Sequence, residues 1–203
     1  MPGRTREDRI DTAVLAAARE LLDKNGYAEL SIGQVAAKAG LHRPAIYRRW
    51  PSKRHLVVDV VADLLGLQPT PNTGDLRADL TIAMRNLVAA LRDTSLSYVL
   101  PALVADLAND PDLRAHFLAT VFEPRRRTTA IALESAIHRG EIDPGIDLDF
   151  VLDAVAAPIY YRALFGHLPL TEPLADQSVD AVLHAITRGP AESPPESVGD
   201  CRC

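Results

Sequence analysis

Basic and aromatic side chains gather in one short stretch of this 203-residue chain. Arg43 and Tyr47 stand four residues apart, so on a helix they would project from one face. Pro44 and Arg48 are related in the same way, and Lys53 follows at the start of the next expected helix. The planar fork of arginine can hydrogen-bond to O6 and N7 of guanine, and tyrosine or lysine can contact a phosphate. The stretch therefore indicates contact with DNA.

The charge of the chain changes sign along its length. Residues 1–58 hold 11 basic and 6 acidic side chains, whereas residues 59–203 hold 11 and 21, within a net charge of −5. A basic module favours binding to a polyanion, and an acidic body repels the same polyanion. Uneven solvated surface charge would give the same counts, so charge alone leaves both interpretations open.

The composition is that of an ordinary globular protein, with 47% hydrophobic, 24% charged and 5% aromatic residues. The longest apolar run, residues 154–161, is far shorter than the ~20 residues that a membrane-spanning helix needs, and no signal-peptide segment follows the N-terminal arginines. We therefore expect a cytoplasmic protein without a membrane partner. The only cysteines, Cys201 and Cys203, lie near the end of the chain, so neither a disulfide framework nor a zinc site is expected.

Apolar positions recur at three- and four-residue spacing, with no sustained alternation, so we expect an all-α fold. The first helix should span residues 8–24 and stop at Asn25-Gly26. Ser31 and Gln34 form a capping-box pattern that opens a second helix, which Gly40 ends. A third short helix follows, with Pro44 in its first turn, and Ser52 caps a fourth.

The remaining helices should span residues 75–93, 97–109, 110–138, 147–165 and 171–187. Pro124 is expected to kink the 110–138 helix, because proline cannot donate to the helical hydrogen-bond ladder. Almost no apolar side chains occur after Gly189, so residues 189–203 are expected to be a disordered tail. The expected domains are therefore residues 1–58 and 59–188.

The two short helices around Gly40-Leu41-His42 match the spacing of a helix-turn-helix, whose second helix can enter the major groove of DNA. Apolar side chains from both helices are spaced to form a small core, which leaves another face free for DNA. These core residues are Val35, Ala36, Ala39, Leu41, Ile46 and Trp50.

Residues 40–53, which read Gly-Leu-His-Arg-Pro-Ala-Ile-Tyr-Arg-Arg-Trp-Pro-Ser-Lys, resemble the signature of the tetracycline-repressor (TetR) family of bacterial transcription regulators. The resemblance extends upstream through Gly26-Tyr27 and residues 31–36, and so covers about residues 8–58. Residues 139–142 and 158–161 also resemble a common ligand-domain subtype of that family.

The resemblance implies a helix-turn-helix DNA-binding domain followed by a helical ligand-binding and dimerisation domain. It also implies a homodimeric repressor of a near-palindromic double-stranded DNA operator, released by a small-molecule effector. The DNA-binding residues that it implies, together with those that side-chain chemistry indicates, are Ser31, His42, Arg43, Pro44, Ala45, Tyr47, Arg48 and Lys53.

The last two expected helices carry enough apolar surface for a four-helix dimer interface as in the family. The residues concerned are Phe150, Val151, Leu152, Ala154, Val155, Ile159, Leu174, Val179, Val182, Leu183 and Ile186. A small-molecule pocket could be lined by Met84, Tyr98, Leu103, Phe117, Val121, Phe122, Tyr160 and Tyr161. In both sets, packing inside the subunit is the alternative interpretation.

Three acidic residues stand four positions before a histidine and could share a metal, but pairing on an exposed helix surface explains them more simply. The pairs are Asp112/His116, Glu134/His138 and Asp180/His184. The run Arg125-Arg126-Arg127 is interpreted as the charged face of a kinked helix in preference to a second anion contact.

An all-helical enzyme is the main rival hypothesis. The sequence shows no Glu-x-x-His pairs, no His-Glu-x-x-His, no Asp-Asp-x-x-Asp cluster, no Gly-rich phosphate loop and no Gly-x-Ser-x-Gly elbow, so neither catalysis nor a cofactor is predicted. A scaffold that has lost DNA binding is a third hypothesis. The presence of Arg43, Tyr47 and Lys53 argues against it.

Overall fold

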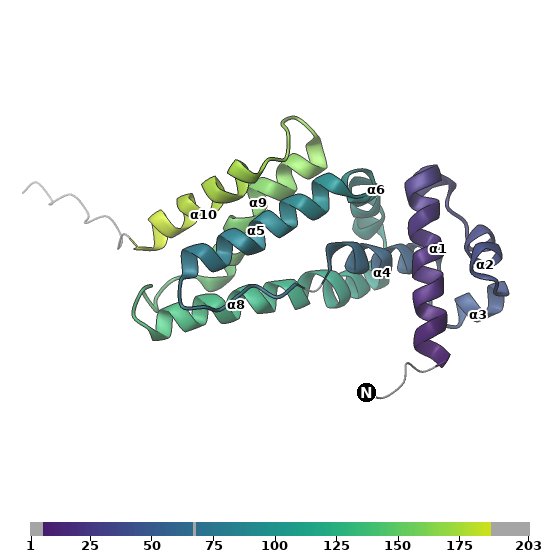
Figure 1. Cartoon of the computed structure of the whole chain (residues 1–203), viewed down its shortest axis with the longest axis horizontal. Coiled ribbons are helices and arrows are strands. Elements are labelled where there is room, and N and C mark those ends of the chain that lie inside the picture. Colours follow the sequence, from purple (N-terminus) through teal and green to yellow (C-terminus); the bar gives the residue numbers. More distant parts are fainter. Residues whose placement is uncertain (1–5, 67, 188–203) are drawn as a thin grey trace, which may run out of the picture.

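The computed structural model describes residues 6–66 and 68–187, so the tail expected at residues 189–203, with its two cysteines, lies outside the described residues. Every regular element within these ranges is helical, which confirms the all-α prediction. Figure 1 shows two bodies. A small N-terminal body contains α1, α2 and α3, a larger bundle contains the long C-terminal helices, and α4 runs between them.

The N-terminal helices begin and end at local signals. They are α1 (Arg6–Glu29), α2 (Ile32–Ala39) and α3 (Arg43–Tyr47). Helix α1 is interrupted at Gly26, which has a φ of 78°, as the expected stop at Asn25-Gly26 requires. Both hydrogen bonds of the predicted capping box between Ser31 and Gln34 are present. Gly40 ends α2 in the left-handed conformation, with a φ of 67°.

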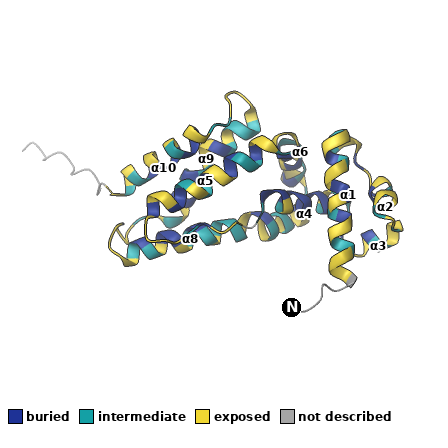
Figure 2. Ribbon diagram, in the orientation of Figure 1, coloured by how far each residue is buried: buried dark blue, intermediate teal, exposed yellow. Residues whose placement is uncertain are grey.

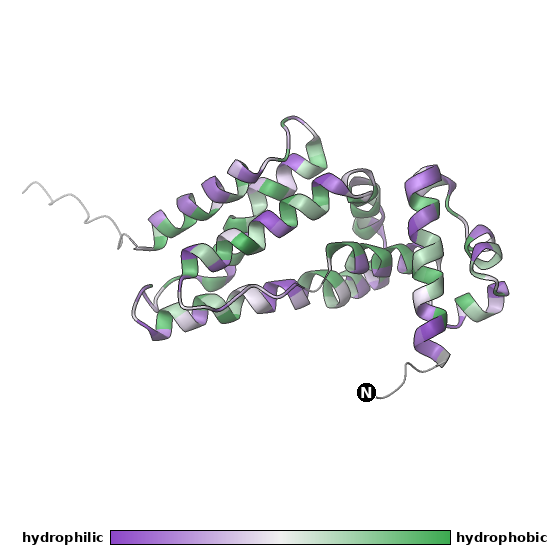
Figure 3. Cartoon of the chain, viewed as in Figure 1, coloured by the Kyte–Doolittle hydropathy of each residue, from purple (hydrophilic) through white to green (hydrophobic). Residues whose placement is uncertain are grey.

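Helix α4 (Lys53–Leu65) is buried from both sides. It begins at Ser52, whose hydroxyl accepts from the backbone N–H of His55, and ends at Gly66. It contacts α1 on one side and α6, α7 and the π-helical turn that follows α7 on the other. Figure 3 shows hydrophobic residues along its length. The residues of α4 without solvent exposure are Leu56, Val57, Val58, Val60 and Val61.

The C-terminal bundle is built from helices whose buried apolar faces point inward (Figure 2). Helix α5 packs against α8, α9 and α10, and α9 also packs against α8 and α10. The helices are α5 (Leu76–Asp93), α6 (Leu96–Asn109), α7 (Pro111–Phe117), α8 (Glu123–His138), α9 (Leu148–Phe165) and α10 (Glu172–Thr187). Aspartates cap α5, α7 and α9, at Asp75, Asp110 and Asp147.

The single helix expected at residues 110–138 is instead three helical segments. A π-helical turn, η1 (Leu118–Phe122), separates α7 from α8. Pro124 has no N–H to donate to the carbonyl four residues earlier, and the N–H of Glu123 bonds to Leu118 five residues back. The disruption expected from Pro124 is therefore a widened turn just before the proline.

Within the described residues, no single helix is both long and apolar enough to cross a membrane. Only α5 and α6 taken together, with a bend of 92° between them, meet the length and composition criteria.

The buried side of α8 should carry much of the stability of the bundle. Leu133 has no solvent exposure, whereas Ile131 on the same helix is 47% exposed. We expect Leu133→Ala to lower the free energy of unfolding by about 2–5 kcal/mol, because it leaves a cavity, and Ile131→Ala to lower it by less than about 1 kcal/mol. Urea unfolding followed by circular dichroism, at one protein concentration, measures both values. Equal losses would contradict the placement of α8.

Candidate DNA-binding surface and ligand cavity

The predicted recognition helix is α3, which presents polar side chains to solvent. His42 precedes it in an extended conformation without a side-chain capping bond, and Pro44 occupies its first turn. Ile46 and Trp50 are buried, as predicted for the small core, and Tyr47 is 51% exposed. Exposed side chains on and beside α3 are His42, Arg43, Pro44 and Arg48, and Ala45 is partly buried.

The guanidinium of Arg43 lies against the first turn of α2. A Cβ atom built on Gly33 would stand 2.5 Å from Nη2 of Arg43, so only glycine leaves this space open without a shift of the arginine. Ser31 lies next to this turn and is exposed, with its hydroxyl 2.9 Å from Oε1 of Gln34. Ser31 and Arg43 thus flank one end of α2, and their contact with DNA stays a prediction.

Lys53 is held by the end of α1. Its Nζ donates to the carbonyl oxygens of Tyr27 at 3.2 Å and Ala28 at 3.0 Å, and it lies 5.3 Å from the centre of the Tyr27 ring. The residue is partly buried. The sequence predicted only a phosphate contact here, which remains a prediction, and missed this attachment of α4 to α1.

One carboxylate joins the N-terminal body to the bundle. Asp59 on α4 accepts through Oδ2 from Nε1 of Trp50 at 2.7 Å, and its Oδ1 lies 2.7 Å from Nε2 of His116 on α7. Trp50 closes the loop that follows α3, and the ring of His55 lies 5.4 Å from that of His116. Asp59 therefore links α3, α4 and α7.

A second polar cluster connects α1 to α6. The hydroxyl of Tyr27 donates to Asp106, which also pairs with Nη2 of Arg54 at 3.3 Å. Burial raises the pKa of the Tyr27 hydroxyl, and its bond to Asp106 raises the pKa further, so the phenol stays a donor. The hydroxyl of Tyr98 on α6 donates to the carbonyl of Leu22 on α1 at 3.2 Å.

The three predicted acid–histidine pairs on helix surfaces are wrong. His116 pairs with Asp59 and not with Asp112. Asp180 pairs with Arg77 at 2.6 Å, and Nδ1 of His138 lies 2.7 Å from the backbone carbonyl of Glu134. For His116 and Asp180 the partner is a side chain on another helix, and for His138 it is a backbone carbonyl of its own helix. No group of three metal-ligating side chains occurs within the described ranges.

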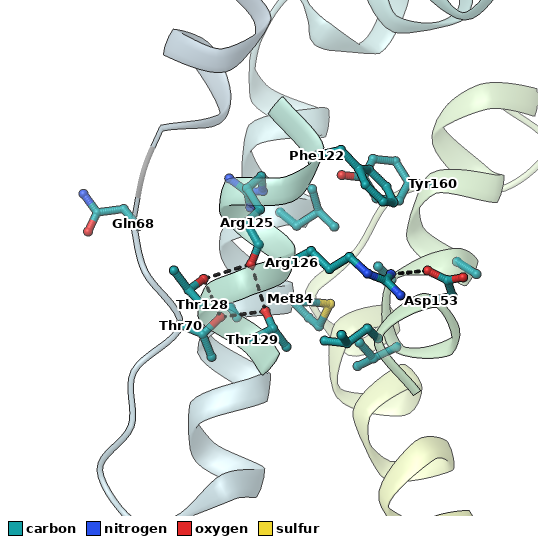
Figure 4. A pocket seen from close by; sticks show the side chains of 16 residues that line it. Gln68, Thr70, Met84, Phe122, Arg125, Arg126, Thr128, Thr129, Asp153 and Tyr160 are labelled. Carbon is teal, nitrogen blue, oxygen red and sulfur yellow. Dashed lines mark hydrogen bonds and ion pairs between the residues drawn. The ribbon is translucent and has the colours of Figure 1, made fainter. Parts of the chain in front are cut away.

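The bundle encloses a cavity of about 350 Å³ between α5, α8 and α9 (Figure 4). Met84, Phe122 and Tyr160, three of the predicted pocket residues, line it. Its other walls come from the segment before α5 and from α5, α8 and α9. They are Gln68, Thr70, Ala83, Leu87, Arg125, Arg126, Thr128, Thr129, Leu152, Asp153, Val155, Ala156 and Ala157.

Five predicted pocket residues lie elsewhere. Leu103 is fully buried in the core, and Phe117 is packed against that core. Tyr98 faces α1, Val121 borders a separate hollow beside α4, and Tyr161 is 57% exposed. Apolar residues at helical spacing do not show in sequence which of them line a void.

The three consecutive arginines of α8 do not form one charged face, contrary to the prediction. Nη1 of Arg125 donates to the carbonyls of Leu65 at 2.9 Å and Gly66 at 3.0 Å. Arg126 pairs with Asp149 and Asp153 on α9, and Arg127 is exposed. Consecutive helical residues point about 100° apart, so the three side chains reach different surroundings.

Most of the predicted dimer residues of α9 and α10 are buried inside the subunit, which favours the alternative interpretation for those side chains, and an interface through these two helices stays a prediction. The buried ones are Val151, Leu152, Val155, Ile159, Leu174, Val179 and Val182. Another face of α9 carries an apolar stripe, with Phe150 68%, Tyr161 57% and Phe165 69% exposed. We call it the α9 stripe, and its members are Phe150, Ala154, Tyr161 and Phe165.

Comparison with known proteins agrees with this arrangement. Residues 14–60 match the family described as bacterial regulatory proteins, tetR family, and residues 70–182 match the tetracyclin repressor-like C-terminal domain. The HTH-type transcriptional regulator YdeS of Bacillus subtilis is 28% identical over 163 residues, which cover 80% of this chain and 82% of YdeS.

The DNA-binding transcriptional repressor TetR of Mycobacteroides abscessus is 29% identical over 181 residues, which cover 87% of this chain and 93% of that protein. The crystal structure of the TetR family transcription regulator SCO0332 superposes with a TM-score of 0.74 at 29% identity, over 90% of this chain and 100% of the other. The fold and the helix-turn-helix define a DNA-binding transcription regulator. The chain belongs to the TetR family.

The Asp59 junction can be tested through Trp50, which is the single tryptophan. Asp59→Ala leaves the buried indole N–H without its acceptor, so we expect the free energy of unfolding to fall by about 1–3 kcal/mol. The tryptophan emission should also move to longer wavelength as water reaches the ring. Asp63→Ala, which removes an exposed carboxylate one turn later on α4, is the control and should change neither value. Identical behaviour of the two variants would refute the junction.

Proposed function

We propose that this regulator is a homodimeric repressor that binds a near-palindromic operator and is released by a small molecule in the bundle cavity. The observation that carries DNA recognition is the exposed surface of α3, where Arg43, Tyr47 and Arg48 face solvent while Ile46 and Trp50 anchor the helix. The Mycobacteroides abscessus relative is named as a transcriptional repressor, which supports repression. No catalytic role is proposed.

The α9 stripe supports the dimer. Phe150, Tyr161 and Phe165 are each more than half exposed, and burial of such side chains contributes most of the free energy of association. The stripe runs along the side of α9 that faces away from the subunit core, so a two-fold partner could pair its own α9 against it. Two recognition helices held in this way would read two half-sites.

Release by a ligand requires a structural element that contacts both the cavity and the recognition helix and that can change position. Helix α4 is such a part, because its N-terminal half carries Asp59 beside Trp50 and its C-terminal carbonyls bind Arg125 of the cavity wall. A ligand that prefers one position of α4 would lower operator affinity by its differential affinity for that position, typically ~1–3 kcal/mol.

The test of the proposal is selection of bound sequences from a random duplex pool by the purified protein at near-physiological salt. We expect an enriched inverted repeat whose half-sites are spaced by the DNA helical repeat. Enrichment of a single unrepeated site would contradict the dimer. If the ligand-free protein enriched no sequence, the proposal that this chain is a sequence-specific regulator would be contradicted.

Substitutions on the DNA-binding surface should separate base reading from phosphate binding. Arg43→Ala is expected to relax sequence preference at one position per half-site, at a loss of about 1–3 kcal/mol. Lys53→Ala is expected to weaken binding to all sequences alike and to reduce the salt slope by about 1. Arg92→Ala, on the bundle, is the control. Titrations of operator and scrambled duplex at several salt concentrations measure these effects, and an unchanged salt slope for Lys53→Ala would refute its phosphate contact.

A charge placed in the α9 stripe should split the dimer. Phe165→Glu buries a carboxylate in the proposed interface, so we expect monomers in sedimentation equilibrium and weaker operator binding. Ile82→Glu, at a comparably exposed apolar position on α5, should leave the oligomeric state unchanged. A dimeric Phe165→Glu variant would place the interface elsewhere.

A further inference from the structure

The bundle cavity is mostly apolar, but three polar groups of its described wall have no side-chain partner. Its threonines are satisfied internally, since the hydroxyls of Thr128 and Thr129 donate to the carbonyl of Arg125, and Thr70 bonds to Thr129 at 2.8 Å. The remaining groups are the guanidinium of Arg125, the hydroxyl of Tyr160 and the neutral amide of Gln68 (Figure 4). Of these three groups, only Arg125 carries a charge with which it can recognise a ligand.

Arg125 is a cation without a carboxylate partner among the described residues. Only its Nη1 atom is hydrogen-bonded, and both acceptors are backbone carbonyls, those of Leu65 and Gly66. Its neighbour Arg126, by contrast, is neutralised by Asp149 and Asp153. A partly buried charge without a counter-ion is costly, so an anion that reaches Arg125 would be bound strongly.

Tyr160 lines the same cavity as Arg125. Burial raises the pKa of its hydroxyl, and the positive charge of Arg125 opposes part of that change. The phenol therefore stays protonated and can donate a hydrogen bond, as Arg125 can. Together they present two donors and no acceptor charge to a bound molecule.

We propose that the cavity selects an apolar organic molecule that carries a single anionic group, such as a carboxylate, bound by Arg125 and Tyr160. The regulatory role of such a ligand rests on the proposed function, whereas its binding depends only on the residues of the cavity. The apolar part would lie against Met84, Leu87 and Phe122. On the wall formed by α9, the charge of Asp153 is paired with Arg126, so Arg125 is the one unpaired charge of the described cavity wall.

The same arginine connects ligand binding to α4. The carbonyls of Leu65 and Gly66 close the C-terminal end of α4 and are held by Nη1 of Arg125. A carboxylate is a stronger acceptor than a backbone carbonyl, so it would draw the guanidinium away from α4. An anion is thus the class of ligand that can both fill the cavity and loosen that helix.

The experiment is isothermal titration calorimetry on the full-length, DNA-free protein with probes matched in shape. The pairs are 1-naphthoate with 1-naphthylmethanol and octanoate with octan-1-ol, and octylammonium serves as the cation. We expect each acid to bind about tenfold to a hundredfold more tightly than its alcohol, because hydrogen bonds to a charged group are the stronger ones. The cation should bind less tightly than either.

Variants assign the preference to Arg125. Arg125→Gln should bring the affinity of each acid down to that of its alcohol, while Arg125→Lys keeps the charge and should keep the preference. Arg127→Gln, which removes the exposed neighbouring charge, is the matched control and should behave as the unmodified protein. Arg125→Lys also keeps the test valid if Arg125→Gln fails to fold.

The outcomes separate this inference from the proposed function. Equal binding of acids and alcohols, tighter binding of octylammonium, no binding of any probe, or an acid preference that survives in Arg125→Gln would each overturn the inference. Acid selectivity in a protein that enriches no operator would support the ligand class and refute only the regulator.

Discussion

The carboxylate of Asp59 is the interaction on which the arrangement of the two bodies depends. Apolar contacts around α4 bury surface, but they are non-directional and do not by themselves fix the angle between helices. Asp59 supplies direction, because one oxygen binds Trp50 at the end of the recognition helix and the other binds His116 in the bundle. The hydrogen bond from Tyr27 on α1 to Asp106 on α6 is a second directional contact between the two bodies.

The basic side chains of the N-terminal body fall into two groups, those in ion pairs and those without an ion pair. Lys38 pairs with Glu20, Arg49 pairs with Asp11, and Arg54 pairs with Asp106. These cations stabilise the fold or attach it to the acidic bundle. Arg43 and Arg48 have no ion pair within the described ranges, and both are exposed on or beside α3. Some of the basic residues in the first 58 positions are therefore held in ion pairs within the protein, and only the others are free to bind a polyanion.

Sequence reasoning succeeded where the cause of a structure is local. Caps at Ser31, Gly40 and Ser52 depend on residues within one turn of each other, so their positions could be stated in advance. In contrast, the choice of a partner among side chains far apart in the chain could not be predicted. His116 has Asp112 one turn away, yet it binds Asp59, more than fifty positions earlier in the chain. Similarly, nothing in the sequence places Lys53 against the end of α1, where its Nζ donates to two backbone carbonyls.

By itself, the sequence determined the helical class, the helix-turn-helix and the family, because helical periodicity, capping residues and the motif at residues 40–53 are all read along the chain. Tertiary structure decided which face of α9 stays exposed, which arginines of residues 125–127 line the cavity and which apolar side chains line it. A widened turn before Pro124 precedes these arginines and helps to set their direction. Packing between helices, which depends on side chains far apart in the chain, is the physical reason for the difference.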